Sequence, residues 1–396
     1  MVVTVDYISI AMEKGLSRAQ SYQLRLEFND KEMAGAFKEQ LCSYLYPEGR
    51  PERRVLVLLN PKGGSCQAHK IYKLIVEPML RAAQIAVEMK RTEYTKHAQL
   101  LTYQLDLDKY TGLVVLGGDG LLHEAINGLL TRRDWARVSK LPICIVPAGT
   151  GNAVARSVGM LDSVLATYSL IKGNTRQYDA VLYEQDGRRF YGHFAFMWGL
   201  VADIDIEGNT MRWMGHKRVF WATLARLIKM QRYHAVIEYL PADGNDSPIA
   251  QDSSSDQPTT RYKQLFDDVD ERIIRKNSSE YYSIIAVKHA YLDRNFFISR
   301  QITLDNTSDA IHTFLASAPG LTRWQIFKTL LSNDGSAIND QPEITQYVRV
   351  RAMRISFKEY EESIVDIDGE EKPKLDLYME SIPQAICYTI PPSSSW

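Results

Sequence analysis

The sequence predicts a mostly parallel α/β domain followed by a domain of antiparallel strands. Two observations support this fold class. Between residues 55 and 157, short apolar runs alternate with segments of helical period, which is the pattern of strands joined by crossover helices. After about residue 178 the pattern changes to strands in which apolar and polar residues alternate. The length agrees, because 396 residues exceed what one hydrophobic core ordinarily serves.

The chain divides at changes of composition. Residues 1–52 read as an extension with one strand, Tyr22–Phe28, and one helix, Lys31–Tyr46, and they end in the turn-forming run Pro-Glu-Gly-Arg-Pro-Glu. Residues 53–178 form the predicted α/β domain and residues 179–396 the β domain. A stretch near 241–280, poor in apolar residues and rich in serine and acids, predicts a disordered insertion between two strands.

The elements of the α/β domain follow one another in a regular order. They are strand 55–59, helix 68–83, strand 85–91, helix 96–104, strand 112–116, helix 121–130, strand 142–146 and helix 152–157. The strands of the β domain are expected at 179–184, 189–196, 235–240, 281–287 and 349–357. A helix at about 217–233 interrupts these strands.

Composition excludes several classes of protein. A formal net charge of -1 disfavours nucleic-acid binding, and the four cysteines have no metal-ligand spacing. The first residues lack the basic and apolar regions of a signal peptide, and no apolar stretch approaches the roughly 20 residues that cross a bilayer. We therefore expect a cytoplasmic protein whose membrane association is peripheral.

Three glycine-containing turns each follow a predicted strand of the parallel sheet: Asn60–Gly64, Gly117–Gly120 and Pro147–Asn152. The carboxyl ends of parallel strands share one edge, so these turns should converge. Glycines let the backbone approach phosphate oxygens, and the helix starts beyond the second and third turns favour an anion. No turn matches a Walker A loop or a dinucleotide-binding fingerprint, so an ordinary P-loop enzyme or dehydrogenase is disfavoured.

Asp119 stands between two glycines of the second turn, where its carboxylate can reach a terminal phosphate. Such an aspartate can accept the proton of an attacking hydroxyl, although it could instead be a turn residue that caps the next helix. Glu124 is either a site residue or a solvated acid on the helix face. His123 is more typical of a hydrogen-bonded structural histidine than of a catalytic one.

These motifs resemble the diacylglycerol-kinase catalytic superfamily of lipid kinases, and within it the sphingosine kinases. The resemblance covers about residues 54–240 and the last fifty. The runs that carry it, besides the three turns, are Gly117–Glu124, Asn127–Leu129 before Asp134-Trp135, Trp198–Asp205, Arg232-Tyr233 with Tyr239–Pro241, and Asp368–Glu370. One departure concerns the first turn, because Ser65-Cys66-Gln67 replaces a lysine and a glycine usual in the family, so the grip on ATP should be weaker.

The resemblance implies a phosphofructokinase-like nucleotide domain and a β-sandwich domain that encloses a lipid, with ATP and Mg²⁺ between them. It implies transfer of the γ-phosphate to the primary hydroxyl of sphingosine or a related long-chain base, giving sphingosine 1-phosphate. ATP would contact Asn60, Pro61, Lys62, Thr92, Glu93, Glu124, Gly149, Thr150, Gly151, Arg189, Asp368, Gly369 and Glu370. The lipid would meet Gly117, Gly118, Gly120, the base Asp119 and Asp179, the expected partner of the amine.

Other functions stay open at this stage. A ceramide or diacylglycerol kinase is the nearest alternative, and Asp179 argues against it because neither lipid offers an ammonium group. NAD and sugar-phosphate kinases share the Gly-Gly-Asp-Gly turn but need cationic residues for a charged substrate, and an inactive nucleotide-binding scaffold would not need Asp119. The basic amphipathic helix at 217–233 packs in the core, docks a calmodulin-like calcium sensor as the resemblance suggests, or rests on an anionic membrane.

Overall fold

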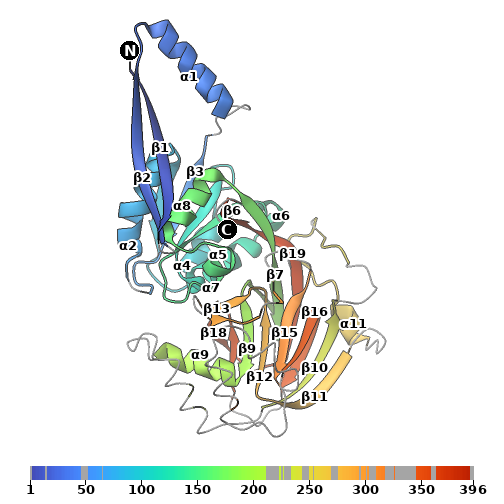
Figure 1. The fold of residues 1–396 in the computed structure, drawn as a ribbon. Helices are drawn as coiled ribbons and strands as arrows, with labels where there is room; N and C mark the ends of the chain where they lie inside the picture. The colour runs from blue at the N-terminus through green and yellow to red at the C-terminus, as the bar shows by residue number, and fades with distance from the viewer. Residues whose placement is uncertain are drawn as a thin grey trace.

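The computed structural model has two halves that share one sheet, with a hairpin and a helix projecting from the first (Figure 1). It describes residues 2–13, 16–45, 52–64, 66–210, 223, 226, 233–242, 249–252, 254–268, 275–293, 296–299, 301–302, 309–316, 325, 345–357 and 363–392. Among these residues, no helix combines the length and the apolar character needed to span a membrane.

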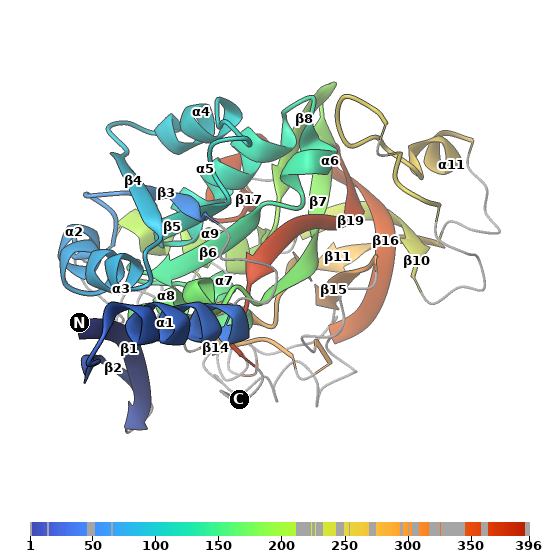
Figure 2. The same cartoon turned by 90° about the horizontal axis from the view of Figure 1, so that it is seen from above.

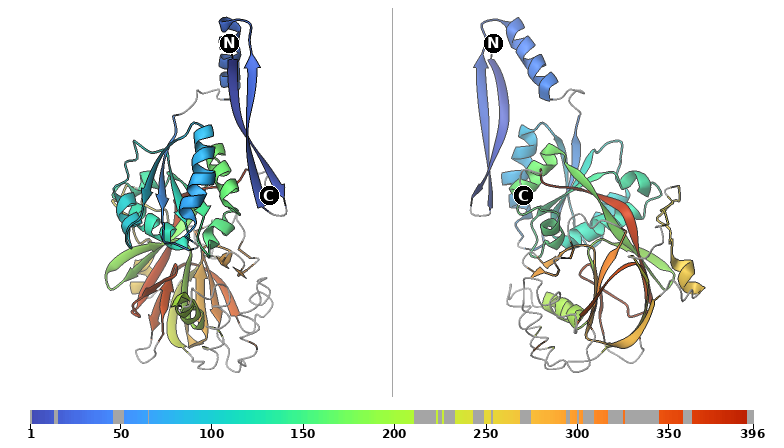
Figure 3. Two further views of the ribbon diagram at one scale, coloured as in Figure 1. Left: turned by 90° about the vertical axis from the view of Figure 1, so that its left-hand side faces the viewer. Right: turned by 45° about the vertical axis from the view of Figure 1, so that its right-hand side comes forward.

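The N-terminal extension is a hairpin followed by a helix. Strands β1 (Val2–Glu13) and β2 (Leu16–Glu27) pair antiparallel along their whole length, and α1 (Lys31–Leu45) follows. Figure 3 shows the hairpin beside the body of the molecule. The predicted helix is confirmed, but the prediction of a single strand was wrong, because residues 2–13 supply the partner that an isolated strand lacks.

The α/β half contains four parallel strands in the order β4-β3-β5-β6. They are β3 (Arg54–Leu59), β4 (Ala86–Arg91), β5 (Gly112–Gly117) and β6 (Pro142–Pro147). The helical segments are α2 (Ala68–Ile71), the π-helical turn η1 (Tyr72–Val76), α3 (Glu77–Ala82), α4 (His97–Tyr103), α5 (Asp119–Leu130), α6 (Trp135–Val138), α7 (Ala153–Ser157) and α8 (Ser163–Lys172). Figure 2 shows α4 and α5 on one face of the strands and α2, α3 and α8 on the other.

The second half is built almost wholly of antiparallel strands around its own core. The strands are β7 (Thr175–Gln185), β8 (Arg188–Gly192), β9 (Ala195–Gly199), β10 (Tyr233–Pro241), β11 (Arg275–Tyr281), β12 (Ser283–Val287), β13 (Tyr291–Asp293), β14 (Phe296–Phe297), β15 (Ile311–Ala316), β16 (Thr345–Phe357), β17 (Val365–Ile367), β18 (Glu370–Lys372) and β19 (Leu377–Thr389). Its described residues include the helices α9 (Leu200–Thr210) and α11 (Lys263–Asp267). The predicted fold class is confirmed.

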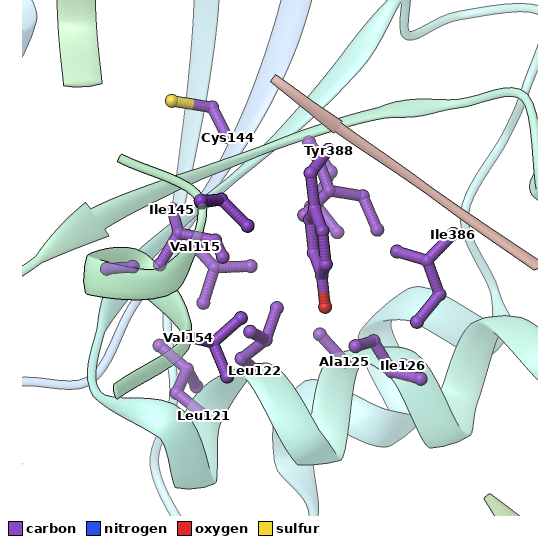
Figure 4. Packing of buried hydrophobic residues seen from close by; sticks show 14 of the residues in the cluster. Val115, Leu121, Leu122, Ala125, Ile126, Cys144, Ile145, Val154, Ile386 and Tyr388 are labelled. Atoms are coloured by element: carbon purple, nitrogen blue, oxygen red, sulfur yellow. The ribbon is translucent and has the colours of Figure 1, made fainter. Parts of the chain in front are cut away.

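Strand β19 joins the two halves. It pairs antiparallel with β16 and β7, and its last residues pair parallel with β6 at Cys387 and Tyr388. Figure 4 shows the Tyr388 ring among apolar side chains of β6 and α5, inside the core of the α/β half. The boundary placed at residue 178 therefore lies inside β7, because one continuous sheet carries both halves.

The prediction of disorder across 241–280 was wrong for the described residues. Arg261 is buried and forms ion pairs with Asp309 and Glu380, and Tyr262 and Phe266 pack into a small core beneath them. Three side chains with distant partners thus hold a segment whose average composition is polar. The predicted helix at 217–233 lies outside the described residues except for Thr223, Arg226 and Tyr233.

Candidate active site

The three glycine turns converge at the carboxyl edge of the parallel strands, as expected. A Cβ atom placed on Gly149 would lie 2.6 Å from the Cα atom of Gly118, and one placed on Gly64 would lie 2.7 Å from the Cα atom of Gly149. Side chains at these positions would force the turns apart. The turns therefore pack backbone against backbone and leave a surface that phosphate oxygens can approach.

Asp119 begins α5 but bonds to a different helix. Its Oδ2 accepts a hydrogen bond from the N–H of Ala153 at 3.0 Å, and its Oδ1 accepts one from the N–H of Val154 at 3.1 Å. Asp119 thus caps α7 instead of its own helix, and the two bonds hold the carboxylate at the meeting point of the second and third turns. Asn152 stabilises the third turn from within, through two hydrogen bonds to Gly149.

Glu124 binds the backbone of the segment that follows strand β4. Its carboxylate accepts hydrogen bonds from the N–H groups of Lys96, at 2.8 Å, and Ala98, at 3.1 Å, at the start of α4. These bonds position the segment that follows β4, which contains Thr92 and Glu93. Glu124 is therefore a site residue and not merely a solvated acid of the helix face.

The second half contributes the two-residue turn between β17 and β18. Asp368 and Gly369 both have positive φ, 56° and 83°, as this type of tight hairpin turn requires. The buried Asp368 carboxylate accepts hydrogen bonds from the N–H groups of His193, Phe194 and Ala195 and from His123. His123 is thus a hydrogen-bonded structural histidine that ties α5 to the second half.

His123, His193 and Asp368 lie close enough to hold a metal ion, since their ligand atoms are all within 4.8 Å of one another. The Asp368 carboxylate, however, already accepts three backbone N–H bonds, which satisfy its charge without an ion. We interpret the cluster as a hydrogen-bond network between the two halves.

These residues surround a cleft of about 760 Å³ between the halves, the size of a small-molecule site. The predicted residues that line it are Asn60, Lys62, Thr92, Glu93, Gly118, Asp119, Gly120, Glu124, Gly149, Thr150, Gly151, Asp368, Gly369 and Glu370. Lining residues that the sequence analysis did not assign are Gly63, Gly64, Tyr94, Thr95, Leu121, Phe194, Met197, Asp205, Leu292 and Asp293. Of these, Gly63 and Gly64 belong to the first glycine turn, Leu121 to the run Gly117–Glu124 and Asp205 to the run Trp198–Asp205.

Residues 54–183 match the family model described as the diacylglycerol kinase catalytic domain, a span that contains all three glycine turns. The solved structure of a diacylglycerol kinase from Bacillus anthracis has the same fold, with a TM-score of 0.58 at 18% identity over 86% of this chain and 98% of that one.

Curated relatives of the chain include sphingoid-base kinases. Sphingosine kinase 2 of Arabidopsis thaliana is 42% identical over 212 residues, which is 52% of this chain and 44% of the relative. Sphingoid long chain base kinase 4 of Schizosaccharomyces pombe is 34% identical over 50% of this chain and 45% of the relative. This chain therefore spans less than half the length of these two. Human sphingosine kinase 1 is 28% identical over 332 residues, 80% of this chain and 85% of the relative.

Asp179 does not line the cleft between the two halves. Its Oδ2 lies 2.8 Å from Nζ of Lys288 and its Oδ1 accepts the N–H of Gln384, while the side chains of Asp179 and Lys288 are 0% and 5% exposed. A buried ion pair thus occupies the carboxylate expected to bind an amine. The cleft-facing acid of the second half is Asp205 instead.

Three further predicted residues lie outside the lining. Arg189 is on β8 and pairs with Glu184, its neighbour across the β7–β8 ladder, at 3.2 Å. Gly117 is buried at the end of β5 under Leu121, and Pro61 lies in the first turn without lining the cleft.

The electrostatics of the cleft are dominated by acids. Burial is the largest influence on Asp119 and raises its pKa, with the N–H donors of Ala153 and Val154 acting in the opposite direction. A raised pKa makes this carboxylate a stronger proton acceptor. Among the lining residues the acids are Glu93, Asp119, Glu124, Asp205, Asp293, Asp368 and Glu370, against one lysine, Lys62. A polyphosphate would enter such a cleft only together with cations.

Proposed function

We propose that the protein transfers the γ-phosphate of ATP to the primary hydroxyl of sphingosine or a related long-chain base, giving sphingosine 1-phosphate. One observation carries the proposal: Asp119 of the α/β half and Asp205 of the strand-rich half line the same cleft. In a lipid with a hydroxyl and an ammonium group on neighbouring carbons, one carboxylate can accept the hydroxyl proton while the other binds the ammonium. The sphingoid-base kinases among the relatives agree with this chemistry.

The glycine turns suit the phosphates of ATP. Gly64, Gly118 and Gly149 leave no side chain between the phosphates and the backbone, and Lys62 adds a positive charge at the rim. The acid-rich lining fits Mg²⁺ as the accompanying cation, because this ion takes one or two carboxylates together with phosphate oxygens. Asp293, which would approach to 3.8 Å of a Cβ on Gly151, is the carboxylate we assign to it. When bound, the ion would neutralise charge on the phosphates.

Asp119 acts on the hydroxyl. It accepts the hydroxyl proton while the substrate oxygen forms a bond to the γ-phosphorus and the bond from that phosphorus to the ADP oxygen breaks. Its two N–H bonds, from Ala153 and Val154, fix the carboxylate and leave lone pairs for that proton. A general base of this kind contributes roughly 100- to 10,000-fold to the rate.

Asp205 selects the lipid. A carboxylate at the edge of an apolar site can hold an ammonium group, and Phe194, Met197 and Leu292 provide apolar lining in the same cleft. Ceramide and diacylglycerol offer no ammonium, since the nitrogen of ceramide is acylated and diacylglycerol has none. Both lipids would bring no positive charge to Asp205 and would bind more weakly.

The test compares lipids that differ at the nitrogen. The full-length protein is incubated with labelled ATP·Mg²⁺ and, separately, sphingosine, a short-chain ceramide and diacylglycerol in detergent micelles, and the lipid products are separated. We expect label in sphingosine. Label in diacylglycerol or ceramide with none in sphingosine would overturn the proposal, and so would the absence of any labelled lipid.

Two variants separate the acids of the site. Asp205→Asn should raise the KM for sphingosine by at least about tenfold, because it removes a charge-assisted hydrogen bond. Asp179→Asn, which alters a buried pair away from the cleft, should lower stability while leaving the KM for sphingosine closer to that of the unchanged protein. A larger increase of the KM for sphingosine in Asp179→Asn than in Asp205→Asn would indicate that Asp179 binds the amine.

A long-chain base resides in membranes, so the proposed activity requires contact with a membrane surface. We propose a peripheral contact, in keeping with the expectation from the sequence. Co-sedimentation with phospholipid vesicles tests it directly, and a protein that stays in the supernatant at every vesicle concentration would exclude it. The calcium-sensor contact predicted for 217–233 stays a prediction.

A further inference from the structure

Helix α7 contacts groups from both sides of the cleft. Its first two N–H groups donate to the carboxylate of Asp119. The helix also packs against strand β13 of the strand-rich half, where the hydroxyl oxygen of Ser157 accepts the N–H of Tyr291 at 3.4 Å. The strand that begins at Tyr291 ends at Asp293, which lines the cleft. One short helix therefore holds the proposed base and touches the strand that carries a second cleft carboxylate.

Strands β13 and β14 depend on such a contact for their position. Among the described residues they pair only with each other and form a two-stranded sheet apart from the large one. A two-stranded hairpin is marginally stable by itself in water, so it needs a surface to pack against. Leu292 and Asp293 of this hairpin line the cleft. The placement of both side chains therefore depends on what the hairpin packs against.

Arg156 supplies a second contact between α7 and the hairpin. Its guanidinium carbon lies 5.3 Å from the centre of the Tyr291 ring, which is the geometry of a cation–π interaction. The Tyr291 ring lies 5.1 Å from the ring of Phe297 on β14, so the contact extends to both strands of the hairpin. The Nε atom of Arg156 is buried and has no hydrogen-bond partner among the described residues. Packing on the ring therefore positions this side chain more than a hydrogen bond from Nε does.

Asp119 and Asp293 approach the same glycine of the third turn. A Cβ atom on Gly151 would lie 3.3 Å from Oδ2 of Asp119 and 3.8 Å from Oδ2 of Asp293. The first carboxylate comes from the α/β half and the second from the strand-rich half. Both are linked to α7, Asp119 by hydrogen bonds to the start of the helix and Asp293 through the strand it shares with Tyr291.

The cation–π contact is the stronger of the two links to the hairpin. The Ser157 oxygen lies at a long hydrogen-bond distance from the Tyr291 nitrogen, and its hydroxyl already donates to the carbonyl of Ala153 at 2.9 Å. A cation over an aromatic ring changes an equilibrium constant by roughly three- to tenfold at a partly buried site, and Arg156 is partly buried. Loss of Arg156 should therefore shift the hairpin measurably while the rest of the domain stays folded.

We propose that Arg156 is a positioning residue that holds the hairpin β13–β14 on α7 and so keeps Asp293 beside Asp119, where it can serve the cation that accompanies the nucleotide phosphates. The inference rests on the proposed function, because it takes Asp293 as the carboxylate for Mg²⁺. A single helix then sets the distance between the base and this carboxylate, although the two belong to different halves of the molecule.

The test compares two metal complexes of a non-hydrolysable ATP analogue by titration calorimetry. In the Mg²⁺ complex a carboxylate can replace a water on the metal, whereas the ammonia ligands of the tetraamminecobalt(III) complex do not exchange. Arg156→Met should raise the Kd of the Mg²⁺ complex about three- to tenfold and leave the Kd of the cobalt complex nearly unchanged. Arg156→Lys keeps a cation for the ring and should recover most of the loss. Equal increases for the two complexes would overturn the proposal.

Variants of the hairpin test the same contact from the other side. Tyr291→Phe keeps the ring and should bind both complexes like the unchanged protein, whereas Tyr291→Leu should resemble Arg156→Met. Lys109→Met is the matched control, because it removes a cation that lies 4.9 Å from the ring of Tyr110 and does not line the cleft. Both Kd values should be unaffected by it. A Tyr291→Leu variant that binds the Mg²⁺ complex normally would contradict the proposal.

A double-mutant cycle tests whether Arg156 acts through Asp293. Asp293→Asn should weaken binding of the Mg²⁺ complex, and adding Arg156→Met to it should cause little further loss, because the carboxylate that Arg156 positions is already gone. Losses that multiply in full in the double variant would show that Arg156 acts by another route and would overturn the role.

The two proposals fail in different ways, since these binding measurements need no lipid. If sphingosine is not phosphorylated but the cycle shows coupling between Arg156 and Asp293, the proposed function fails and the positioning role stands. If sphingosine is phosphorylated and the two losses are independent, the function stands and this inference fails.

Discussion

Gly118 and Gly149 face each other so closely that a Cβ atom on Gly149 would lie 2.6 Å from the Cα atom of Gly118. Two hydrogen bonds hold them at this distance, since the N–H groups of Ala148 and Gly149 both donate to the carbonyl of Gly117. The second and third turns are therefore one rigid unit at the edge of the sheet. Asp119 completes it through its bonds to α7.

Gly149→Ala should separate these turns, because the added methyl meets backbone and cannot be relieved by rotating a side chain. We expect the Kd for ATP·Mg²⁺ to rise by at least about tenfold and the protein to lose about 1–3 kcal/mol of stability. Titration calorimetry with ATP·Mg²⁺ and thermal unfolding measure the two effects. Gly35→Ala in α1 is the control, as its Cβ would meet nothing within 4 Å and an alanine there favours the helix. ATP binding unaffected by Gly149→Ala would show that the turns do not hold the phosphates.

Asp119→Asn should reduce kcat by roughly 100- to 10,000-fold, because the amide cannot accept the hydroxyl proton. It should also cost about 0.5–2 kcal/mol of stability, since one of the two N–H groups of α7 then faces an NH₂ group. Single-turnover assays and denaturant unfolding separate the two losses. Turnover close to that of the unchanged protein would remove Asp119 from the reaction.

Asp368→Asn should destabilise the fold in a pH-dependent way. Burial alone would raise the pKa of Asp368, but His193 and the hydrogen bonds from His123 and His193 outweigh it and hold the pKa well below its usual value. A depressed folded-state pKa stabilises the protein above the unfolded-state pKa, about 3.9, and this contribution is lost as the pH falls through the folded-state pKa.

We therefore expect a loss of about 3–5 kcal/mol at pH 7 that becomes smaller below about pH 4. Urea unfolding at several pH values measures it. Glu371→Gln, at an exposed acid three residues further on, provides the comparison and should change stability by less than about 0.5 kcal/mol. A deficit in Asp368→Asn that stays constant down to pH 3 would contradict the assignment of the charge to Asp368.

Arg261→Met should be among the most destabilising single changes in the strand-rich half. Arg261 pairs with Asp309 at 2.7 Å and Glu380 at 3.2 Å with only 2% of its side chain exposed, so its loss leaves two buried carboxylates without a cation. Removing one partner of a buried ion pair is expected to lower the free energy of unfolding by about 3–5 kcal/mol. Chemical unfolding measures it.

Lys263→Met is the matched control for Arg261→Met. Lys263 lies two residues away and pairs with Glu184, but 36% of its side chain is exposed. Its replacement should cost less than about 1 kcal/mol. Equal losses in the two variants would show that the ion-pair group around Arg261 does not anchor the segment.

The parallel half was predictable because its signals are local. Buried runs such as Val55–Leu59 and glycines at strand ends predict strands and turns from short stretches of sequence, and the rule that parallel strands share a carboxyl edge brings the turns together. The hairpin partner at residues 2–13 and the helix α8 were missed. The hairpin depends on pairing between its two strands, whereas α8 carries the local signals of a helix, Asp162 as its N-cap and Gly173 at its C-terminal end, which the sequence analysis did not use.

The acids of the second half show where sequence reasoning stops. The sequence pointed to Asp179 as the amine partner, yet Lys288 neutralises Asp179 in a buried ion pair, and it is Asp205 that lines the cleft. Lys288 is 109 residues from Asp179 in the chain, so nothing near Asp179 reveals the pair. The order near residues 254–268 likewise depends on partners at 309 and 380.

The sequence by itself determined the fold class, the three turns and Asp119, because glycine spacing and strand periodicity are properties of neighbouring residues. Tertiary structure alone decided which carboxylates are neutralised by buried cations and which face the cleft. The free energy of a charged side chain depends on groups within a few ångströms in space, and the chain brings those groups from positions far apart along its length.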